Sequence, residues 1–159
     1  MLKHIHILYV FVASLTLSSS AQTLSKEQIQ ASYIYNFSKH ITWSNERSLS
    51  SFRILLLGPK NATLQKTFEN LARRKRIKGL PISILQSNSY EFTPEAEIIF
   101  AYDPPQSLNK FYMRIQGKNS LLVTNKYNNK RLVMVNFYQA QGNKLLFEIN
   151  KANIINQGL

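Results

Sequence analysis

Apolar and polar positions recur with two different periods along the chain, and the change of period separates expected helices from expected strands. Ser25 and Gln28 have the spacing of a capping box, and apolar residues then recur every four positions. This pattern predicts a helix from about Lys26 to His40. The short apolar run Phe52–Leu57, which a Gly-Pro pair follows, instead predicts a buried strand, because it is too short for a helix.

The rest of the chain continues this alternation. We expect helices over 61–76, over 107–116 and from 152 onward, and strands over 80–85, 98–101, 120–124, 132–138 and 144–149. The last two strands flank Gln141-Gly142-Asn143 and predict an antiparallel hairpin. Strands that alternate with helices predict a single α/β layered domain with a mostly parallel central sheet.

The N-terminus has the pattern of an export signal. Lys3 precedes an apolar stretch from Ile5 to Leu17, and the small residues Ser19 and Ala21 follow. The stretch is shorter than the roughly 20 residues of a spanning helix. We therefore expect a cleavable signal peptide over residues 1–21 and a mature domain over 22–159, in preference to the alternative of an uncleaved membrane anchor.

Charge and composition narrow the classes of partner. The 159 residues include 20 Lys and Arg against 8 Asp and Glu, for a net charge of +12, and no Cys. Without Cys the chain has no disulfide framework, thiol nucleophile or zinc ribbon. Removal of the signal takes away Lys3, which leaves 19 minus 8, or +11. Export argues against nucleic acid, so the charge favours anionic lipid, cell-wall polymer or an acidic protein face.

Residues that could carry catalysis are sparse. His40 is the one His that remains after the signal, and no carboxylate lies within a helical turn of it. No His or carboxylate spacing favours a metal, so no catalytic, metal or cofactor site is expected. Two loops at strand ends, 58–61 and 103–105, are either rigid turns or small-ligand loops, and both interpretations stay open.

Two groups of residues are candidates for contact with a partner or a membrane. Arg73, Arg74, Lys75 and Arg76 form the densest run of charge and lie at an expected helix C-terminus. They are either a solvated helix end or a contact for anionic headgroups.

The second group lies on the first expected helix. Helical geometry turns Tyr33 and Phe37 inward and leaves Tyr35, Asn36 and Lys39 on other sides of the helix. We therefore expect Tyr35, Asn36 and Lys39 to form a partner-facing patch.

Four segments, in order, resemble landmarks of the YfiR family of periplasmic regulators. They are Ala31–Trp43, which contains the pattern YNFxKxxxW; Phe52–Gly58, which begins Phe-Arg-Ile; Arg76–Ile82; and the pair Val135-Asn136-Phe137 and Leu146–Asn150, which resembles the closing INF…FEIN pattern. The resemblance covers residues 29 to 151.

The resemblance implies a Rossmann-like three-layer α/β/α sandwich and a regulator that is not an enzyme. Such proteins restrain an inner-membrane diguanylate cyclase from the periplasm and are released when an OmpA-like outer-membrane lipoprotein sequesters them. Similar domains are sensory parts of histidine kinases, so a sensor kinase is a second expected effector. A periplasmic small-ligand-binding sensory domain is the alternative function, and a homodimer is left open.

The chain departs from the family pattern in three places. It has no cysteines, whereas family members commonly carry disulfide-forming ones. Asn129–Leu132 replaces the glycines that usually precede the INF strand. The family continues into a final helix, and this sequence stops at Leu159, so we expect a truncated or shortened C-terminal helix.

Overall fold

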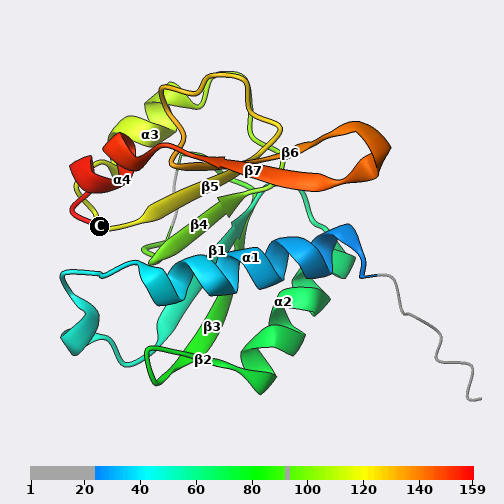
Figure 1. Cartoon of the computed structure of the whole chain (residues 1–159). Coiled ribbons are helices and arrows are strands. Elements are labelled where there is room, and N and C mark those ends of the chain that lie inside the picture. The colour runs from blue at the N-terminus through cyan, green and yellow to red at the C-terminus, as the bar shows by residue number, and fades with distance from the viewer. Residues whose placement is uncertain (1–23, 92–93) are drawn as a thin grey trace, which may run out of the picture.

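A computed structural model describes residues 24–91 and 94–159, so the predicted signal peptide lies outside the described residues. Seven strands form one sheet in the order β2-β3-β1-β4-β5-β6-β7, and helices pack against it (Figure 1). The helices are α1 (Lys26–His40), α2 (Ala62–Arg74), α3 (Asn109–Ile115) and α4 (Lys151–Asn156), with 3₁₀ turns η1 (Glu46–Ser48) and η2 (Gln141–Asn143). The strands are β1 (Phe52–Leu57), β2 (Arg76–Ile77), β3 (Leu80–Ser87), β4 (Ile98–Ala101), β5 (Leu121–Asn125), β6 (Val135–Gln139) and β7 (Leu145–Ile149).

The sheet is parallel through its middle and antiparallel at both edges. β3, β1, β4, β5 and β6 pair parallel, whereas β2 pairs antiparallel with β3 and β7 antiparallel with β6. The expected mixed α/β fold with a mostly parallel sheet is confirmed. Its description as a Rossmann-like three-layer sandwich stays a prediction.

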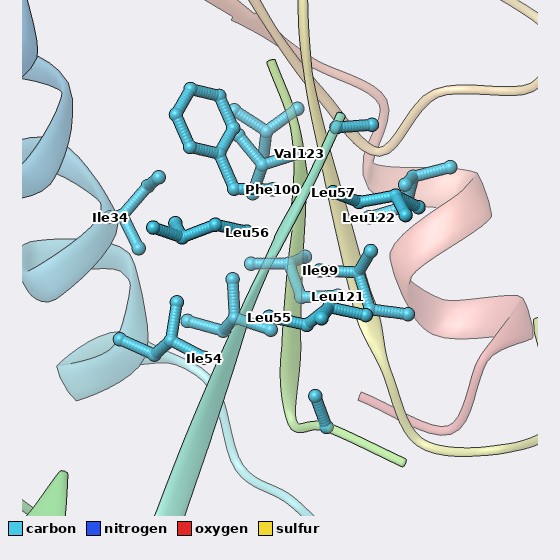
Figure 2. Packing of buried hydrophobic residues seen from close by; sticks show 14 of the residues in the cluster. Ile34, Ile54, Leu55, Leu56, Leu57, Ile99, Phe100, Leu121, Leu122 and Val123 are labelled. Atoms are coloured by element: carbon cyan, nitrogen blue, oxygen red, sulfur yellow. The ribbon is translucent and has the colours of Figure 1, made fainter. Parts of the chain in front are cut away.

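The core is built on the central strands. Every residue of β4 is buried, and β1 is buried except for Arg53. Ile54 and Leu56 lie on the side of the sheet that faces Ile34 of α1 (Figure 2). Because the side chains of a strand alternate between its two faces, such nearly continuous burial requires apolar cover on both sides of the sheet.

Helix α1 begins and ends where its pattern predicts. Gln28 donates its backbone N–H to the hydroxyl of Ser25 at 3.2 Å, and Ser25 returns its own N–H to the Gln28 side chain at 2.8 Å. The rings of Tyr33 and Phe37 contact Phe147, with centroids 4.9 and 5.0 Å apart. These contacts confirm the expected inward face and fix α1 against the β6–β7 end of the sheet.

The second helix is shorter than predicted. It ends at Arg74, Lys75 has extended backbone, and Arg76 lies in β2 rather than in a helix. The cause is a tight turn at Lys78 and Gly79, both with positive φ, which pairs Ile77 with Leu80. The extended chain buries Ile77 completely, so the core contact of one apolar side chain decides where the helix stops.

Candidate functional site

The structure places the two predicted surface groups on adjacent elements. Helices α1 and α2 pack against each other, and β2 also contacts α1. Arg74 and Lys75 line a groove of about 400 Å³, and Gln28 and Ser32 of α1 are on its other wall. The basic run therefore lies beside α1, which sequence spacing alone does not predict.

The groove wall on α1 continues toward the predicted aromatic patch. Gln28, Ser32, Tyr35 and Lys39 are spaced four, three and four residues apart, so they form one stripe along the helix. The ammonium of Lys39 lies 4.7 Å from the centre of the Tyr35 ring, a cation–π contact. Asn36 and Lys39 are exposed and Tyr35 is half-buried.

We call this region the α1–α2 surface, which consists of Tyr35, Asn36, Lys39, Arg73, Arg74, Lys75 and Arg76. Its four consecutive basic residues are all exposed. Arg73 donates to the side chain of Asn70, and within residues 24–91 and 94–159 none of the four forms an ion pair. Their charges are not neutralised by the fold, so they give this surface a positive field.

Sequence reasoning missed a buried ion pair at the start of β1 and β4. Glu97 is 2% exposed, and its carboxylate accepts from the backbone N–H and the guanidinium of Arg53, each at 2.7 Å. The hydrogen bond from Arg53 to Glu97 raises the pKa of Arg53, and the carboxylate charge adds to this effect. Trp43 donates its indole N–H to the Glu97 carbonyl at 3.2 Å. Trp43 and Arg53 belong to segments that resemble the family. That resemblance was the one sequence signal that pointed to the Arg53–Glu97 pair.

A cavity borders this ion pair. The cavity has a volume of about 420 Å³, and Asn45, Arg114 and Lys118 also line it. The side-chain oxygen of Asn45 is buried and has no hydrogen-bond partner among the described residues. Both acidic and basic side chains line this cavity. The cavity lies at the end of the sheet opposite the two strand-end loops.

A second polar cluster forms around the closing motif. Asn136 is 3% exposed; its oxygen accepts from the Tyr127 N–H at 3.0 Å, and its amide donates to Glu148 at 3.0 Å. Lys130 contacts the other Glu148 oxygen at 2.8 Å. The hydrogen bond from Lys130, and then that from Asn136, lowers the pKa of Glu148. The residues of the INF and FEIN patterns therefore attach the 126–134 loop to the sheet.

One strand-end loop is occupied by the protein's own side chain. A Cβ atom at Gly58 would lie 2.9 Å from the ring of Tyr102, and the Tyr102 hydroxyl donates to the Pro59 carbonyl. Asn61 caps α2 by accepting from the Leu64 N–H at 3.0 Å, so that N–H does not point toward a ligand. This geometry favours the rigid-turn interpretation at Gly58.

An open depression remains outside that turn. It has a volume of about 520 Å³ and is lined by Pro59, Lys60, Asn61, Ala62, Tyr102 and Asp103. Residues of both strand-end loops line this depression, so a small ligand that contacts both loops would bind here.

Neither a metal centre nor a membrane-spanning helix is found among the described residues. Within the described ranges, no cluster of three or more His, Asp or Glu residues could hold a metal. No helix in the same ranges combines the length and apolar character needed to cross a bilayer. His40 is exposed at the last position of α1.

Comparison with known protein families gives a match. The family model described as YfiR/HmsC-like matches residues 27–159, from the first turn of α1 to the last residue of the sequence. A search of curated proteins found no match. The matched range contains both polar clusters and the whole α1–α2 surface.

Proposed function

The chain belongs to the YfiR/HmsC-like family, and from this we propose that it is a non-enzymatic periplasmic signalling regulator that binds and restrains an inner-membrane effector. The effector is a diguanylate cyclase or a sensor kinase. The observation that carries the proposal is the family match over the whole described fold. Membership supports a periplasmic regulator of diguanylate cyclase signalling in preference to an enzyme.

The α1–α2 surface is the part of the molecule that we assign to this contact. Arg74 and Lys75 border a groove, and uncompensated positive charge surrounds it. Near a membrane surface that carries anionic headgroups, each Lys or Arg contributes about 1 kcal/mol. The same charges would hold the regulator close to a membrane-embedded effector.

Restraint would operate through differential binding. A regulator that binds the inactive conformation of its effector more tightly than the active one shifts the population toward the inactive state. An OmpA-like outer-membrane lipoprotein that binds the regulator would lower its available concentration and release the effector. Neither step requires a reactive side chain.

Co-purification with the periplasmic segment of a candidate cyclase or kinase tests the contact. The variant R74E/K75E should lose the complex, whereas K110E/K118E, which changes the net charge equally at exposed positions on and after α3, should retain it. Deletion of the gene should raise cyclic di-GMP or change kinase output. Unchanged outputs on deletion would contradict the proposal.

The alternative function is a periplasmic small-ligand-binding sensory domain. The depression beside Lys60 and Asp103 favours it, because a carboxylate and an ammonium line the same open site. A ligand that binds the folded state raises the melting temperature by mass action. A thermal-shift screen with small metabolites therefore separates the two functions, and a saturable shift that K60A abolishes would favour the alternative.

A further inference from the structure

A pocket lies on the face of the β6–β7 hairpin that is turned away from α1 (Figure 1). Phe137 of β6 contacts the rings of Tyr33 and Phe37 of α1. Because side chains alternate between the two faces of a strand, Asn136 and Tyr138 lie on the opposite face. The pocket has a volume of about 550 Å³, in the range of small-molecule sites. Its lining includes Lys126, Asn128, Lys130, Asn136, Tyr138 and Glu148, and we call it the Tyr138 pocket.

Tyr138 forms an aromatic wall of this pocket. It is 38% exposed, although it lies in a strand of the sheet. Its neighbour on the same face, Asn136, is buried and hydrogen-bonded to Thr124 and Tyr127, so the floor of the pocket is fixed. A ligand with an apolar face and a polar edge suits an aromatic wall beside fixed polar groups.

Glu148 adds hydrogen-bond acceptors to the same floor. One of its oxygens accepts from Asn136 and the other contacts Lys130 at 2.8 Å. An ionised carboxylate has about four acceptor positions, so two of them remain for a ligand. Hydroxyl groups can donate to these positions, whereas an anion without donors would be repelled. The ligand that fits Glu148 therefore carries hydroxyl groups.

Lys126 supplies the charge that is left over in the pocket. Lys130 is neutralised by Glu148, whereas Lys126 is exposed and forms no ion pair within residues 24–91 and 94–159. A single uncompensated ammonium matches the one negative charge of a carboxylate. A phosphate monoester, which carries close to two charges at pH 7, would leave part of its charge without a partner.

The backbone of Lys126 is in a conformation that a lysine rarely adopts. Its φ is 56°, in the left-handed region that favours glycine, and its N–H donates to the Phe137 carbonyl at 2.7 Å. Glycine would make the same turn at a lower cost. The turn therefore does not account for a lysine here, whereas the position of its side chain in the pocket does.

We propose that the Tyr138 pocket binds a sugar acid. The apolar face of the sugar ring packs on Tyr138, its hydroxyl groups donate to Glu148, and its carboxylate lies beside Lys126. This site is separate from the α1–α2 surface and from the depression beside Lys60 and Asp103. It does not rest on the proposed function, and its test needs only the purified protein.

Two sugars that differ by one carboxylate test the proposal. Methyl galacturonide and methyl galactoside share a pyranose ring, and each can be titrated into the isotope-labelled protein while the backbone amides are followed by NMR. Both should shift the amides of the pocket, and the galacturonide should bind about threefold more tightly, because an exposed ion pair contributes an effect of that size. Equal dissociation constants, or no shift in the pocket from either sugar, would overturn the proposal.

Matched variants connect this preference to its residues. K126Q should remove the preference for the acidic sugar, whereas K110Q, the same change at an exposed position of α3, should retain it. Y138A should weaken binding of both sugars, and Y138F, which keeps the ring, should bind them nearly as wild type does. Loss of the preference in K110Q to the same extent as in K126Q would contradict the proposal.

A glycine variant separates a role in binding from a role in the fold. K126G relieves the backbone, so its melting temperature should be no lower than that of wild type although the preference for the acidic sugar is lost. A lower melting temperature would show that the lysine serves the fold, and the assignment of Lys126 would be wrong.

A trimer of galacturonate distinguishes two sources of the sugar acid. Tighter binding of the trimer than of the monosaccharide would identify an acidic polysaccharide as the ligand, and equal affinity a free sugar acid.

Discussion

The buried polar clusters and the α1–α2 surface carry different kinds of information about this protein. The clusters around Glu97 and Asn136 contain four residues of the segments that resemble the family, and Glu97 and Asn136 are buried and hydrogen-bonded. The four are Trp43, Arg53, Asn136 and Glu148. The α1–α2 surface is exposed except for the half-buried Tyr35. Motif residues in this chain therefore have two roles, because some belong to the buried clusters whereas Tyr35, Asn36 and Lys39 of the first motif lie on the surface that we assign to partners. How that surface is formed depends on how the fold packs α1 against α2.

The largest effect that separates the two regions should come from Glu97. The variant E97A removes the buried carboxylate and leaves the Arg53 guanidinium, 30% exposed, without its partner. Loss of one member of a buried pair costs about 3–5 kcal/mol, and we expect the lower end because Arg53 reaches solvent. Urea unfolding followed by circular dichroism measures the change.

A double variant provides the control for that measurement. R53M/E97L replaces both charges with apolar side chains, and such replacements are often nearly neutral. It should be clearly more stable than E97A. Stability equal to wild type for E97A would show that the Arg53–Glu97 pair does not hold β1 to β4.

Asn136 should have the next largest effect. N136L leaves the Tyr127 backbone groups and one Glu148 oxygen without the partner that now satisfies them. An unsatisfied buried polar group costs about 1–3 kcal/mol, so we expect a loss of about 2 kcal/mol in the free energy of unfolding. The exposed control N109L, at the start of α3, should change stability little. Equal effects of the two variants would contradict the assigned role of Asn136.

Glu148 should give a smaller effect that depends on pH. Lys130 and Asn136 lower its pKa in the folded state, so the ionised carboxylate stabilises the fold above the unfolded pKa, near 4.3. That contribution is lost as the pH falls through the lower, folded-state value. The stability difference between wild type and E148Q should therefore be present at pH 7 and shrink below about pH 4. A difference that grows on acidification would have the wrong sign.

The fold could be predicted from sequence where local signals are strong. The capping box at Ser25 indicated where α1 begins, the apolar spacing indicated how far it extends, and the Gly-Pro pair indicated the end of β1. β2 was missed because the burial of Ile77, a tertiary contact, overrides the helical pattern of the preceding residues. The partner of Arg53 was missed for the same reason, since Glu97 lies 44 residues away in the chain.

The surface was predicted less completely than the fold. The spacing on α1 left Tyr35, Asn36 and Lys39 outside the inward face, and they are half-buried or exposed in the structure. No local pattern indicates that Arg74 and Lys75 line a groove with α1, because that depends on how α1 packs against α2. The role of these residues in partner contact stays a prediction.

The smallest effect on stability should come from that surface. R74E/K75E changes two exposed side chains that form no ion pair in the described part of the chain, so the free energy of unfolding should change by less than about 0.5 kcal/mol. Binding should respond in the opposite way. Two charges reverse, so the charge at these positions changes by four units, from +2 to −2, and co-sedimentation with vesicles that contain anionic lipid should fall strongly at low salt.

The matched variant K110E/K118E separates a local contact from a general effect of net charge, because it makes the same four-unit change of net charge at two exposed positions on and after α3. If the α1–α2 surface is the contact, this variant sediments with vesicles nearly as wild type does. If both variants lose sedimentation equally, the whole positive field attracts the membrane and no particular surface does. The assignment of partner contact to the α1–α2 surface would then be wrong, while the expected effects of E97A and N136L on stability would be unaltered.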